Sequence, residues 1–397
     1  MLAQKLGDKM LSTRTKNWIP FNKPYLTGKE LINIAQAHEN AQLAGDGVFT
    51  RACQSWLEDL GGHEKALLTH SCTAALEMAA LLCDINPGDE VILPSYTFVS
   101  TANAFVLRGA IPIFVDIRMD TLNIDESKIE KAITERTKVI VAVHYAGVSC
   151  EMDTIMDIAN RHDIFVVEDA AQACLSKYKG RQLGSIGHLG CLSFHETKNI
   201  ISGEGGALLI NTPLLVERAE IIREKGTNRS RFIRGETDKY TWTDIGSSFL
   251  PGEMVAAFLL AQMECAKEIT EKRNVSWNYY HQKLEKLEAY FRSPIVPKEC
   301  THNAHMFYLI NQTGNDRQLI IESLKAQGIH TVFHYVPLHS SPFGRKFEKK
   351  QSELPITDFV SSNLIRLPMW TGLSFAEQDR IINHIQLLTK IDLMISN

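Results

Sequence analysis

The segment Ile164-Phe165-Val166-Val167-Glu168-Asp169-Ala170-Ala171-Gln172 is a short apolar run that leads into two acids. A second run, Gly190-Cys191-Leu192-Ser193-Phe194, ends shortly before Lys198. Short apolar runs of this kind are typical of strands that are buried on both faces of a sheet. Because open α/β sheets bind their ligands at the carboxyl ends of the strands, we expect Asp169 and Lys198 to face one ligand site.

The pairing of Asp169 with Lys198 suggests a specific chemistry. A lysine amine forms a Schiff base with an aldehyde, and pyridoxal phosphate (PLP) is the common biological aldehyde used in this way. The ring nitrogen of PLP must stay protonated to withdraw electrons, which requires a carboxylate partner. Lys198 can be that amine and Asp169 that carboxylate, although an isolated pair is more often a solvated lysine and a structural or capping acid.

Strands and helices alternate along the chain around this pair. Hydrophobic periodicity predicts strands at residues 67–68, 89–94, 111–116, 137–144 and 207–211, and helices at 27–37, 51–60, 74–82, 100–108, 125–134, 151–161 and 214–225. This alternation favours an α/β fold, in which parallel strands are joined by crossover helices.

The pattern changes in the last third of the chain. Residues 253–287 contain no proline and predict one long helix that leads into a smaller unit. That unit is expected to have strands at 306–310 and 331–335 and helices at 317–327 and 375–388. We therefore expect an N-terminal extension at 1–18, a large domain at 19–262 and a small C-terminal domain at 263–397.

Composition excludes several classes of protein. The 397 residues carry a net charge of -4, so neither nucleic acid nor a membrane surface is expected as a partner. The eight cysteines show no C-x-x-C pair and no zinc spacing, which predicts reduced thiols, no metal site and a cytoplasmic location. There is no membrane-spanning run, no secretory signal in residues 1–18, no G-x-G-x-x-G and no P-loop motif.

Two segments before Asp169 are candidates for cofactor contacts. Thr69-His70-Ser71-Cys72-Thr73 precedes a predicted helix, and free N–H groups at a helix N-terminus bind phosphate. A plain serine or threonine N-cap is the simpler reading of that segment. Phe98 follows a predicted strand, where its ring could stack on a planar cofactor or pack in the core.

Two later segments could contact a substrate. Arg229, Arg231 and Arg234 lie in a predicted loop, and arginine forks suit phosphate oxygens as well as they suit solvent. The run His334-Tyr335-Val336-Pro337-Leu338-His339 leads from a predicted strand into a loop with three polar rings, for which structural roles are the default.

Taken together, these segments make the sequence resemble the DegT/DnrJ/StrS-type sugar aminotransferases, which are fold-type I PLP enzymes. The resemblance extends from Ile19 to the C-terminus. Its carriers are Ser71-Cys72-Thr73-Ala74-Ala75-Leu76, Pro94-Ser95-Tyr96-Thr97-Phe98-Val99-Ser100-Thr101-Ala102-Asn103-Ala104, Val166-Val167-Glu168-Asp169-Ala170-Ala171-Gln172, Ser193-Phe194-His195-Glu196-Thr197-Lys198 and Pro337-Leu338-His339.

The resemblance implies a role for each candidate residue. Lys198 would be the Schiff-base lysine and proton carrier, and Asp169 the partner of the ring nitrogen. Phe98 would stack on the cofactor ring, and Gln172 would lie near its 3-hydroxyl. Cys72, Thr73 and Ser193 would bind the phosphate. Substrate contacts are expected at Arg229, Arg231 and Arg234 for the pyrophosphate and at His334, Tyr335 and His339 near the sugar.

The resemblance also implies a fold and a reaction. The fold would be a mostly parallel seven-stranded sheet with helices on both faces and a smaller C-terminal α/β domain. L-Glutamate would donate an amino group to dTDP-4-keto-6-deoxy-D-glucose, giving the 4-amino-4,6-dideoxygalactose product and 2-oxoglutarate. The active site would lie between the subunits of a homodimer.

Some alternatives remain open at the level of sequence. The product could be the gluco epimer or a 3-amino sugar. A PLP- or PMP-dependent sugar dehydratase is disfavoured, because such relatives replace the Schiff-base lysine with histidine, and a non-enzymatic regulator leaves Asp169 and Lys198 unexplained. One departure stands out: Leu250 occupies the position where relatives carry an asparagine that reaches the neighbouring subunit's phosphate site.

Overall fold

The computed structural model describes residues 18–350 and 353–395. All of the expected N-terminal extension except Trp18 therefore lies outside the described residues.

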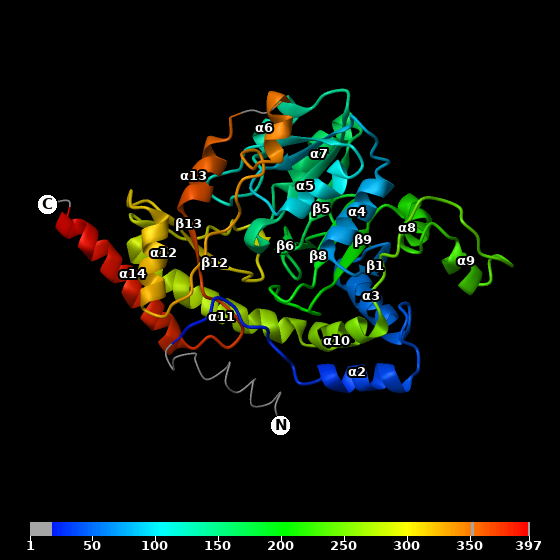
Figure 1. Ribbon diagram of the computed structural model, residues 1–397, viewed down its shortest axis with the longest axis horizontal. Coiled ribbons are helices and arrows are strands. Elements are labelled where there is room, and N and C mark those ends of the chain that lie inside the picture. Colours follow the sequence, from blue (N-terminus) through cyan, green and yellow to red (C-terminus); the bar gives the residue numbers. More distant parts are fainter. Residues whose placement is uncertain (1–17, 351–352, 396–397) are drawn as a thin grey trace.

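A seven-stranded sheet forms the centre of the larger part of the chain (Figure 1). Its strand order is β1-β9-β8-β5-β4-β2-β3, and β9 alone among these seven runs against the others. The strands are β1 (Lys65–Thr69), β2 (Glu90–Pro94), β3 (Ile111–Val115), β4 (Thr137–Val143), β5 (Phe165–Asp169), β8 (Leu189–Ser193) and β9 (Gly206–Ile210). The expected mostly parallel seven-stranded α/β sheet is confirmed.

Helices cover both faces of this sheet (Figure 1). One face packs against α4 (Cys72–Leu82), α5 (Val99–Val106) and α8 (Val216–Arg223). The other packs against α3 (Val48–Gly61), α6 (Glu126–Ala132), α7 (Met152–His162) and α10 (Glu253–Glu264), and α2 (Glu30–Glu39) lies against α10. The neighbours Val166 and Val167 in β5 belong to opposite cores, so this strand is buried on both faces as its sequence predicts.

A second, antiparallel sheet lies in the C-terminal part. It consists of β10 (Phe291–Arg292), β12 (Phe307–Asn311) and β13 (Leu364–Leu367), accompanied by α11 (Ala266–Leu284), α12 (Arg317–Ala326), α13 (Pro355–Asn363) and α14 (Phe375–Ile395). Ile19 packs in the core of this part and pairs with Ile329. The N-terminal segment therefore contacts the C-terminal part, and the domain boundary at 262 stays a prediction.

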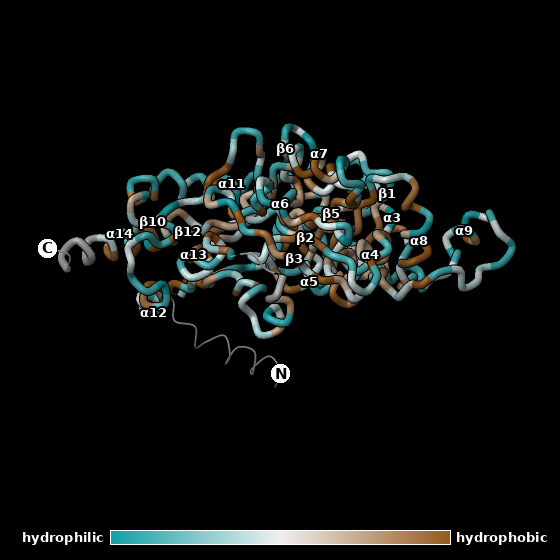
Figure 2. Tube along the Cα trace, turned by 90° about the horizontal axis from the view of Figure 1, so that it is seen from above, coloured by the Kyte–Doolittle hydropathy of each residue, from teal (hydrophilic) through white to brown (hydrophobic). Residues whose placement is uncertain are grey.

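Shorter elements complete the chain. A three-stranded sheet joins β11 (Cys300–Thr301), β6 (Lys177–Tyr178) and β7 (Arg181–Gln182). The 3-10 helices are η1 (Tyr145–Gly147), η2 (Pro213–Leu215), η3 (Glu285–Leu287) and η4 (Gly344–Lys350). Figure 2 shows hydrophobic segments concentrated in the central elements and hydrophilic segments in the outer loops. Within the described chain, no helix has the length and apolarity that crossing a membrane requires.

Three sequence predictions are wrong in detail. The single helix at 253–287 is two helices, because Cys265 leaves the helical conformation (φ -102°, ψ 6°) where α10 ends and α11 begins. The strand at 331–335 is absent: Val332 makes one isolated bridge to Arg366, and the chain then turns into the pocket described below. The loop at 226–234 contains a short helix, α9 (Arg229–Ile233).

Candidate active site

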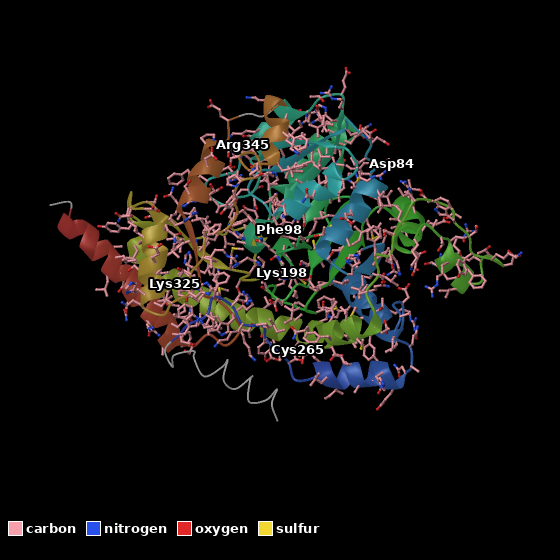
Figure 3. All side chains as sticks on the ribbon, in the orientation of Figure 1. Asp84, Phe98, Lys198, Cys265, Lys325 and Arg345 are labelled. Atoms are coloured by element: carbon pink, nitrogen blue, oxygen red, sulfur yellow. The ribbon has the colours of Figure 1, made fainter. Side chains whose placement is uncertain are left out.

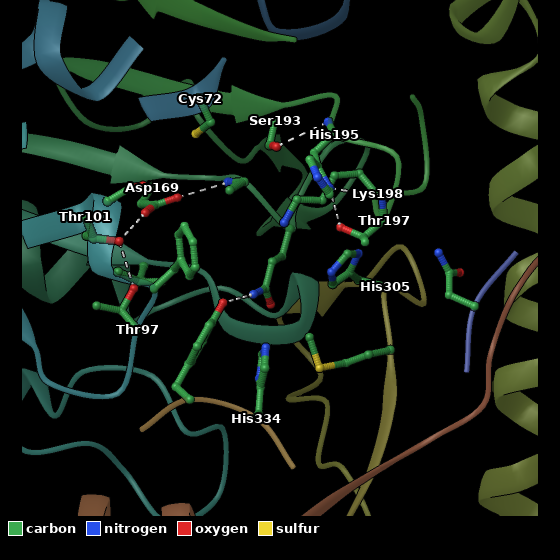
Figure 4. Close-up of a pocket in the computed structure, with 18 of the residues that line it drawn as sticks. Cys72, Thr97, Thr101, Asp169, Ser193, His195, Thr197, Lys198, His305 and His334 are labelled. Atoms are coloured by element: carbon green, nitrogen blue, oxygen red, sulfur yellow. Dashed lines mark hydrogen bonds between the residues drawn. The ribbon is translucent and has the colours of Figure 1, made fainter. Parts of the chain in front are cut away.

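A pocket of about 610 Å³ lies at the carboxyl ends of the central strands and extends to the second sheet. Figure 3 shows Lys198 near the centre of the molecule, and the close-up in Figure 4 shows it among the residues that line the pocket. It is lined by all seven residues for which a cofactor contact is predicted, namely Cys72, Thr73, Phe98, Asp169, Gln172, Ser193 and Lys198. Segments far apart in sequence therefore meet at one site, as the parallel strand order requires.

Asp169 is the last residue of β5, and its carboxylate is buried. Its Oδ2 accepts a hydrogen bond of 2.7 Å from Thr101 Oγ1, and its Oδ1 accepts one of 3.2 Å from Ala171 N. Thr101 is in turn paired with Thr97 at 2.8 Å (Figure 4). Within the described chain no cationic side chain forms an ion pair with this carboxylate, so a ligand cation is its natural partner.

Lys198 lies beyond the end of β8, where its backbone N–H donates to the carbonyl oxygen of His195. Burial lowers the pKa of its amine, and the positive charge of Arg366 lowers it further. Nearby Cys72 and Asp169 offset part of that shift. A lowered pKa increases the share of neutral amine, which is the form that attacks an aldehyde or accepts a proton.

The predicted phosphate site is the N-terminus of α4. Ser71 caps this helix by accepting a hydrogen bond of 3.1 Å from Ala74 N, and first-turn N–H groups such as those of Cys72 and Thr73 have no partner within a helix. Gly206 of β9 lies directly beneath, since a Cβ there would be 2.5 Å from Cys72 N. Ser71 is therefore an N-cap, as the simpler reading holds, and this helix end also lines the pocket, so phosphate binding there stays a prediction.

Phe98 and Gln172 border the space between Asp169 and Lys198. Phe98 is 57% exposed at the start of α5 and lines the pocket rather than the core. Gln172 accepts a hydrogen bond of 2.6 Å from Ala146 N and donates one of 2.7 Å to the hydroxyl of Tyr335. Its side-chain amide is therefore held in one orientation.

Of the three residues predicted to lie near the sugar, two line the pocket and one does not. His334 and Tyr335 line the pocket and stack on each other at 3.7 Å between ring centroids. Burial lowers the pKa of His334 well below its ordinary value, with Arg366 and Lys198 adding to the shift, so this ring is neutral. His339 lies outside the pocket lining, where its Nδ1 is 2.7 Å from Ser95 Oγ and its Nε2 is 3.3 Å from Asp358.

The three predicted arginines also lie outside the pocket of their own chain. They belong to the arm around α9, which projects from the large sheet beyond α8 (Figure 1). Each pairs with glutamate: Arg229 with Glu224, Arg231 with Glu217, and Arg234 with Glu220 and Glu236.

Sequence reasoning missed two arginines of the pocket, Arg273 of α11 and Arg366 of β13. Arg366 interrupts the apolar run Leu364-Ile365-Arg366-Leu367, and a charge inside a buried strand is a signal that could have been used. Arg273 sits in a polar helix, where nothing in the sequence distinguishes it. Leu250, the departure noted above, is half-buried, and its side chain packs against Gly45.

The residues of the pocket fit PLP. A buried carboxylate without a cation, a lysine with a lowered pKa and a helix N-terminus match the pyridinium, the aldehyde and the phosphate of that cofactor. Throughout residues 18–350 and 353–395, no group of three or more His, Cys, Asp or Glu side chains is placed to hold a metal ion.

Comparisons with known proteins agree with this geometry. The model of the DegT/DnrJ/EryC1/StrS aminotransferase family matches residues 24–386. An uncharacterised protein of Methanocaldococcus jannaschii is 36% identical over 383 residues, which cover 95% of this chain and 98% of that protein. The spore coat polysaccharide biosynthesis protein SpsC of Bacillus subtilis is 31% identical over 388 residues, with coverages of 95% and 98%.

Solved structures of aminotransferases also resemble this chain. The sugar aminotransferase Spr1654 of Streptococcus pneumoniae, in its PMP form, superimposes with a TM-score of 0.87 and 25% identity. The match covers 96% of this chain and 99% of that one. The expected architecture of fold-type I PLP enzymes is thereby confirmed.

Proposed function

Because this chain belongs to the DegT/DnrJ/EryC1/StrS aminotransferase family, we propose that it transfers an amino group from L-glutamate to C4 of dTDP-4-keto-6-deoxy-D-glucose. The products are dTDP-4-amino-4,6-dideoxygalactose and 2-oxoglutarate. The observation that carries the proposal is that Lys198 and Asp169 line the same pocket as the N-terminus of α4. The cofactor is PLP, which supplies an aldehyde that accepts the amino group and a ring that withdraws electrons from the reacting carbon.

The protein's own groups divide the remaining work. Asp169, held by Thr101, would keep the ring nitrogen protonated. The amine of Lys198 would remove the α-proton of the amino donor and later deliver a proton to C4 of the sugar, and its lowered pKa favours the neutral form that this role needs. Gln172 and Tyr335, joined by a hydrogen bond, would close the side of the pocket and exclude water.

The choice of sugar nucleotide rests on sequence resemblance. The segments Gly45-Asp46-Gly47, His144-Tyr145-Ala146-Gly147 and Arg223-Glu224-Lys225-Gly226-Thr227-Asn228-Arg229-Ser230 resemble dTDP-4-amino-4,6-dideoxygalactose transaminase of enterobacterial common antigen synthesis. A role in making a cell-surface polysaccharide or lipopolysaccharide in the cytoplasm follows from that resemblance. The name of the Bacillus subtilis relative, a spore coat polysaccharide protein, agrees with such a role.

A homodimer is part of the proposal. The arm around α9 exposes large apolar side chains, with Trp242 81% and Ile233 61% exposed. Exposed apolar side chains gathered on a projecting segment favour contact with another chain. We expect the arm to bring Arg229, Arg231 and Arg234 to the partner's pocket, where they would bind the pyrophosphate of the sugar nucleotide.

Product analysis tests the proposal. PLP-loaded enzyme is incubated with dTDP-4-keto-6-deoxyglucose and L-glutamate, and the product is characterised by NMR. The coupling constants of the ring protons distinguish the galacto from the gluco epimer, and the position of the amine distinguishes C4 from C3. Formation of the gluco epimer or of a 3-amino sugar would show that the proposed product is wrong. If folded protein that carries PLP forms no amino sugar, the proposed function is refuted.

A further inference from the structure

His305 lines the pocket without a predicted contact to the cofactor. The cofactor's ring nitrogen, phosphate and 3-hydroxyl have predicted partners in Asp169, the N-terminus of α4 and Gln172. His305 comes from a different part of the chain, two residues before β12. In Figure 4, Lys198 and His305 lie on one side of the pocket and Asp169 lies on the other. His305 is therefore a candidate for contact with a substrate.

Asn199, the residue after Lys198, fixes which ring nitrogen of His305 carries a proton. Its Nδ2 donates a hydrogen bond of 2.8 Å to the carbonyl oxygen of Asn303, which leaves its Oδ1 directed at His305. That oxygen lies 3.1 Å from Nδ1 of His305, and an amide oxygen can only accept, so Nδ1 carries the proton. Burial lowers the pKa of His305 well below the ordinary histidine value, so the ring is neutral and Nε2 can only accept.

The acceptor nitrogen Nε2 of His305 faces the pocket without a protein partner. None of the described residues forms a hydrogen bond with it, and the surrounding protein does not seal it off. The positive charges of Lys198, Arg273 and Arg366 add to the lowering of the pKa of this ring. Because these charges keep Nε2 unprotonated, a ligand that binds here must supply a hydrogen-bond donor.

The segment that carries His305 is held in an unfavourable backbone conformation. Ala304 has a φ of 51°, which is left-handed and sterically unfavourable for a residue with a Cβ. Arg273 donates to the carbonyl oxygens of Ala304 (3.0 Å) and His305 (2.6 Å). Asn303 Nδ2 donates to two carbonyl oxygens of the loop after β5, at 2.9 Å each. Strain that neighbouring groups enforce in this way is typical of functional sites, and here it fixes the direction of Nε2.

We propose that Nε2 of His305 accepts a hydrogen bond from the 3-hydroxyl of the keto sugar. This role rests on the proposed function and makes His305 a determinant of acceptor specificity. The amine of Lys198 must reach C4, and His305 lies in the same part of the pocket. C3 is the only neighbour of C4 with a hydroxyl, because C5 carries the ring oxygen and the methyl group. The carboxylates of the amino donor have no proton to donate, so they do not suit this acceptor.

Binding of unreactive sugar nucleotides to the PLP-loaded enzyme tests this contact without turnover. The probes are dTDP-6-deoxyglucose and its 3-deoxy and 2-deoxy analogues, none of which has a ketone, and their Kd values are measured by calorimetry. In the wild type, loss of the 3-hydroxyl should raise the Kd by about fivefold or more, because Nε2 loses its partner. Loss of the 2-hydroxyl should have the same effect in the wild type and in the His305 variants.

Two substitutions separate the acceptor nitrogen of His305 from the bulk of its ring. His305→Phe fills the site without an acceptor, so the probes with and without the 3-hydroxyl should bind within about twofold of each other. His305→Gln keeps an acceptor oxygen and should recover part of the preference. If His305→Phe does not fold, His305→Ala allows the same comparison without added bulk. His38→Gln, which changes an exposed histidine on α2, is the control and should keep the wild-type Kd values.

A structural role predicts a different result, because loss of a structural histidine would weaken all three probes alike and leave the ratios of their Kd values unchanged. An unchanged preference for the 3-hydroxyl in His305→Phe would therefore overturn the proposal. Equal binding of the probes with and without the 3-hydroxyl by the wild type, a comparison that needs no variant to fold, would also overturn it. If amino sugar still forms from the keto sugar in either case, the aminotransferase function stands and the role of His305 alone is wrong.

Discussion

Thr101 Oγ1 donates a hydrogen bond of 2.7 Å to Oδ2 of Asp169, and both side chains are buried. The hydroxyl comes from α5 and the carboxylate from the end of β5, so a helix on one face of the sheet fixes the orientation of an acid at its edge. For the proposed contact with the cofactor's ring nitrogen, this hydrogen bond would keep the carboxylate of Asp169 in one orientation.

Replacing Thr101 with valine should weaken the enzyme while keeping its fold. A hydrogen bond to a charged group contributes about 1.5–3 kcal/mol, so we expect PLP affinity or turnover to fall by about tenfold or more. Absorbance titration of the apoenzyme and steady-state kinetics measure the two effects. Thr101→Ser keeps the hydroxyl and should remain close to the wild type. Equal activity of Thr101→Val would show that Asp169 needs no such support.

Lys198→Ala should abolish covalent attachment of the cofactor. Borohydride reduction followed by mass spectrometry should show the added mass of the cofactor on the wild type only, and turnover should fall by at least about a hundredfold. Lys325→Ala, which removes an exposed lysine on α12, is the control. A reducible adduct in Lys198→Ala would refute the assignment.

Gly206→Ala should lower the affinity for the cofactor. The added Cβ would lie 2.4 Å from the carbonyl carbon of Ser71, so the N-terminus of α4 must move. Such overpacking costs about 1–3 kcal/mol, and we expect PLP affinity to fall by about tenfold. Gly252→Ala, whose Cβ would be 3.2 Å from Leu43 O and would have no atom of α4 within 4 Å, should leave that affinity unchanged. Normal PLP binding by Gly206→Ala would contradict the phosphate site.

Stability should depend on pH through Glu168. This buried acid accepts hydrogen bonds from Gly184 N (2.8 Å) and Gly187 N (2.6 Å) and pairs with His144 at 2.9 Å. Burial alone would raise its pKa, but these partners hold the pKa below the ordinary value of 4.5. Its contribution to stability is therefore complete above pH 4.5 and is lost as the pH falls through the folded-state pKa.

Urea unfolding at several pH values tests the role of Glu168. Glu168→Gln should be less stable than the wild type by about 2 kcal/mol at pH 7, and its stability should fall less steeply below pH 4.5. Glu39→Gln, which changes an exposed glutamate on α2, should reproduce the wild-type profile. Parallel curves for the wild type and Glu168→Gln would exclude this acid as the source of the pH dependence.

Loss of the three arginines in the arm around α9 should weaken binding of the sugar nucleotide selectively. Replacing Arg229, Arg231 and Arg234 together with alanine should raise the Kd of dTDP-sugar by about tenfold while leaving the glutamate half-reaction unchanged. The pairs of Arg231 with Glu217 and of Arg234 with Glu236 are exposed and contribute little to stability. Arg229 pairs with the buried Glu224, so the melting temperature of the triple variant should fall, and binding is measured well below it. A selective loss of the glutamate half-reaction would refute their proposed role.

The central sheet could be predicted from the sequence because its strands of five to seven residues are mainly apolar and helices separate β1 to β5 from one another. The common location of Asp169 and Lys198 could be predicted as well, because the carboxyl ends of parallel strands lie at the same edge of the sheet. The break at Cys265 could not be predicted, because no proline or glycine marks it. Arg366 escaped notice because its significance arises only where β13 approaches Lys198 in space.

Helix α11 begins in the core of the large sheet with Ala266 and Ile269 and ends in the core of the second sheet with Tyr280 and Leu284. One rigid rod therefore sets how far apart the two sheets stand. A change in the length of a surface loop would therefore leave that spacing unaltered, whereas an insertion or deletion within α11 would shift one sheet against the other.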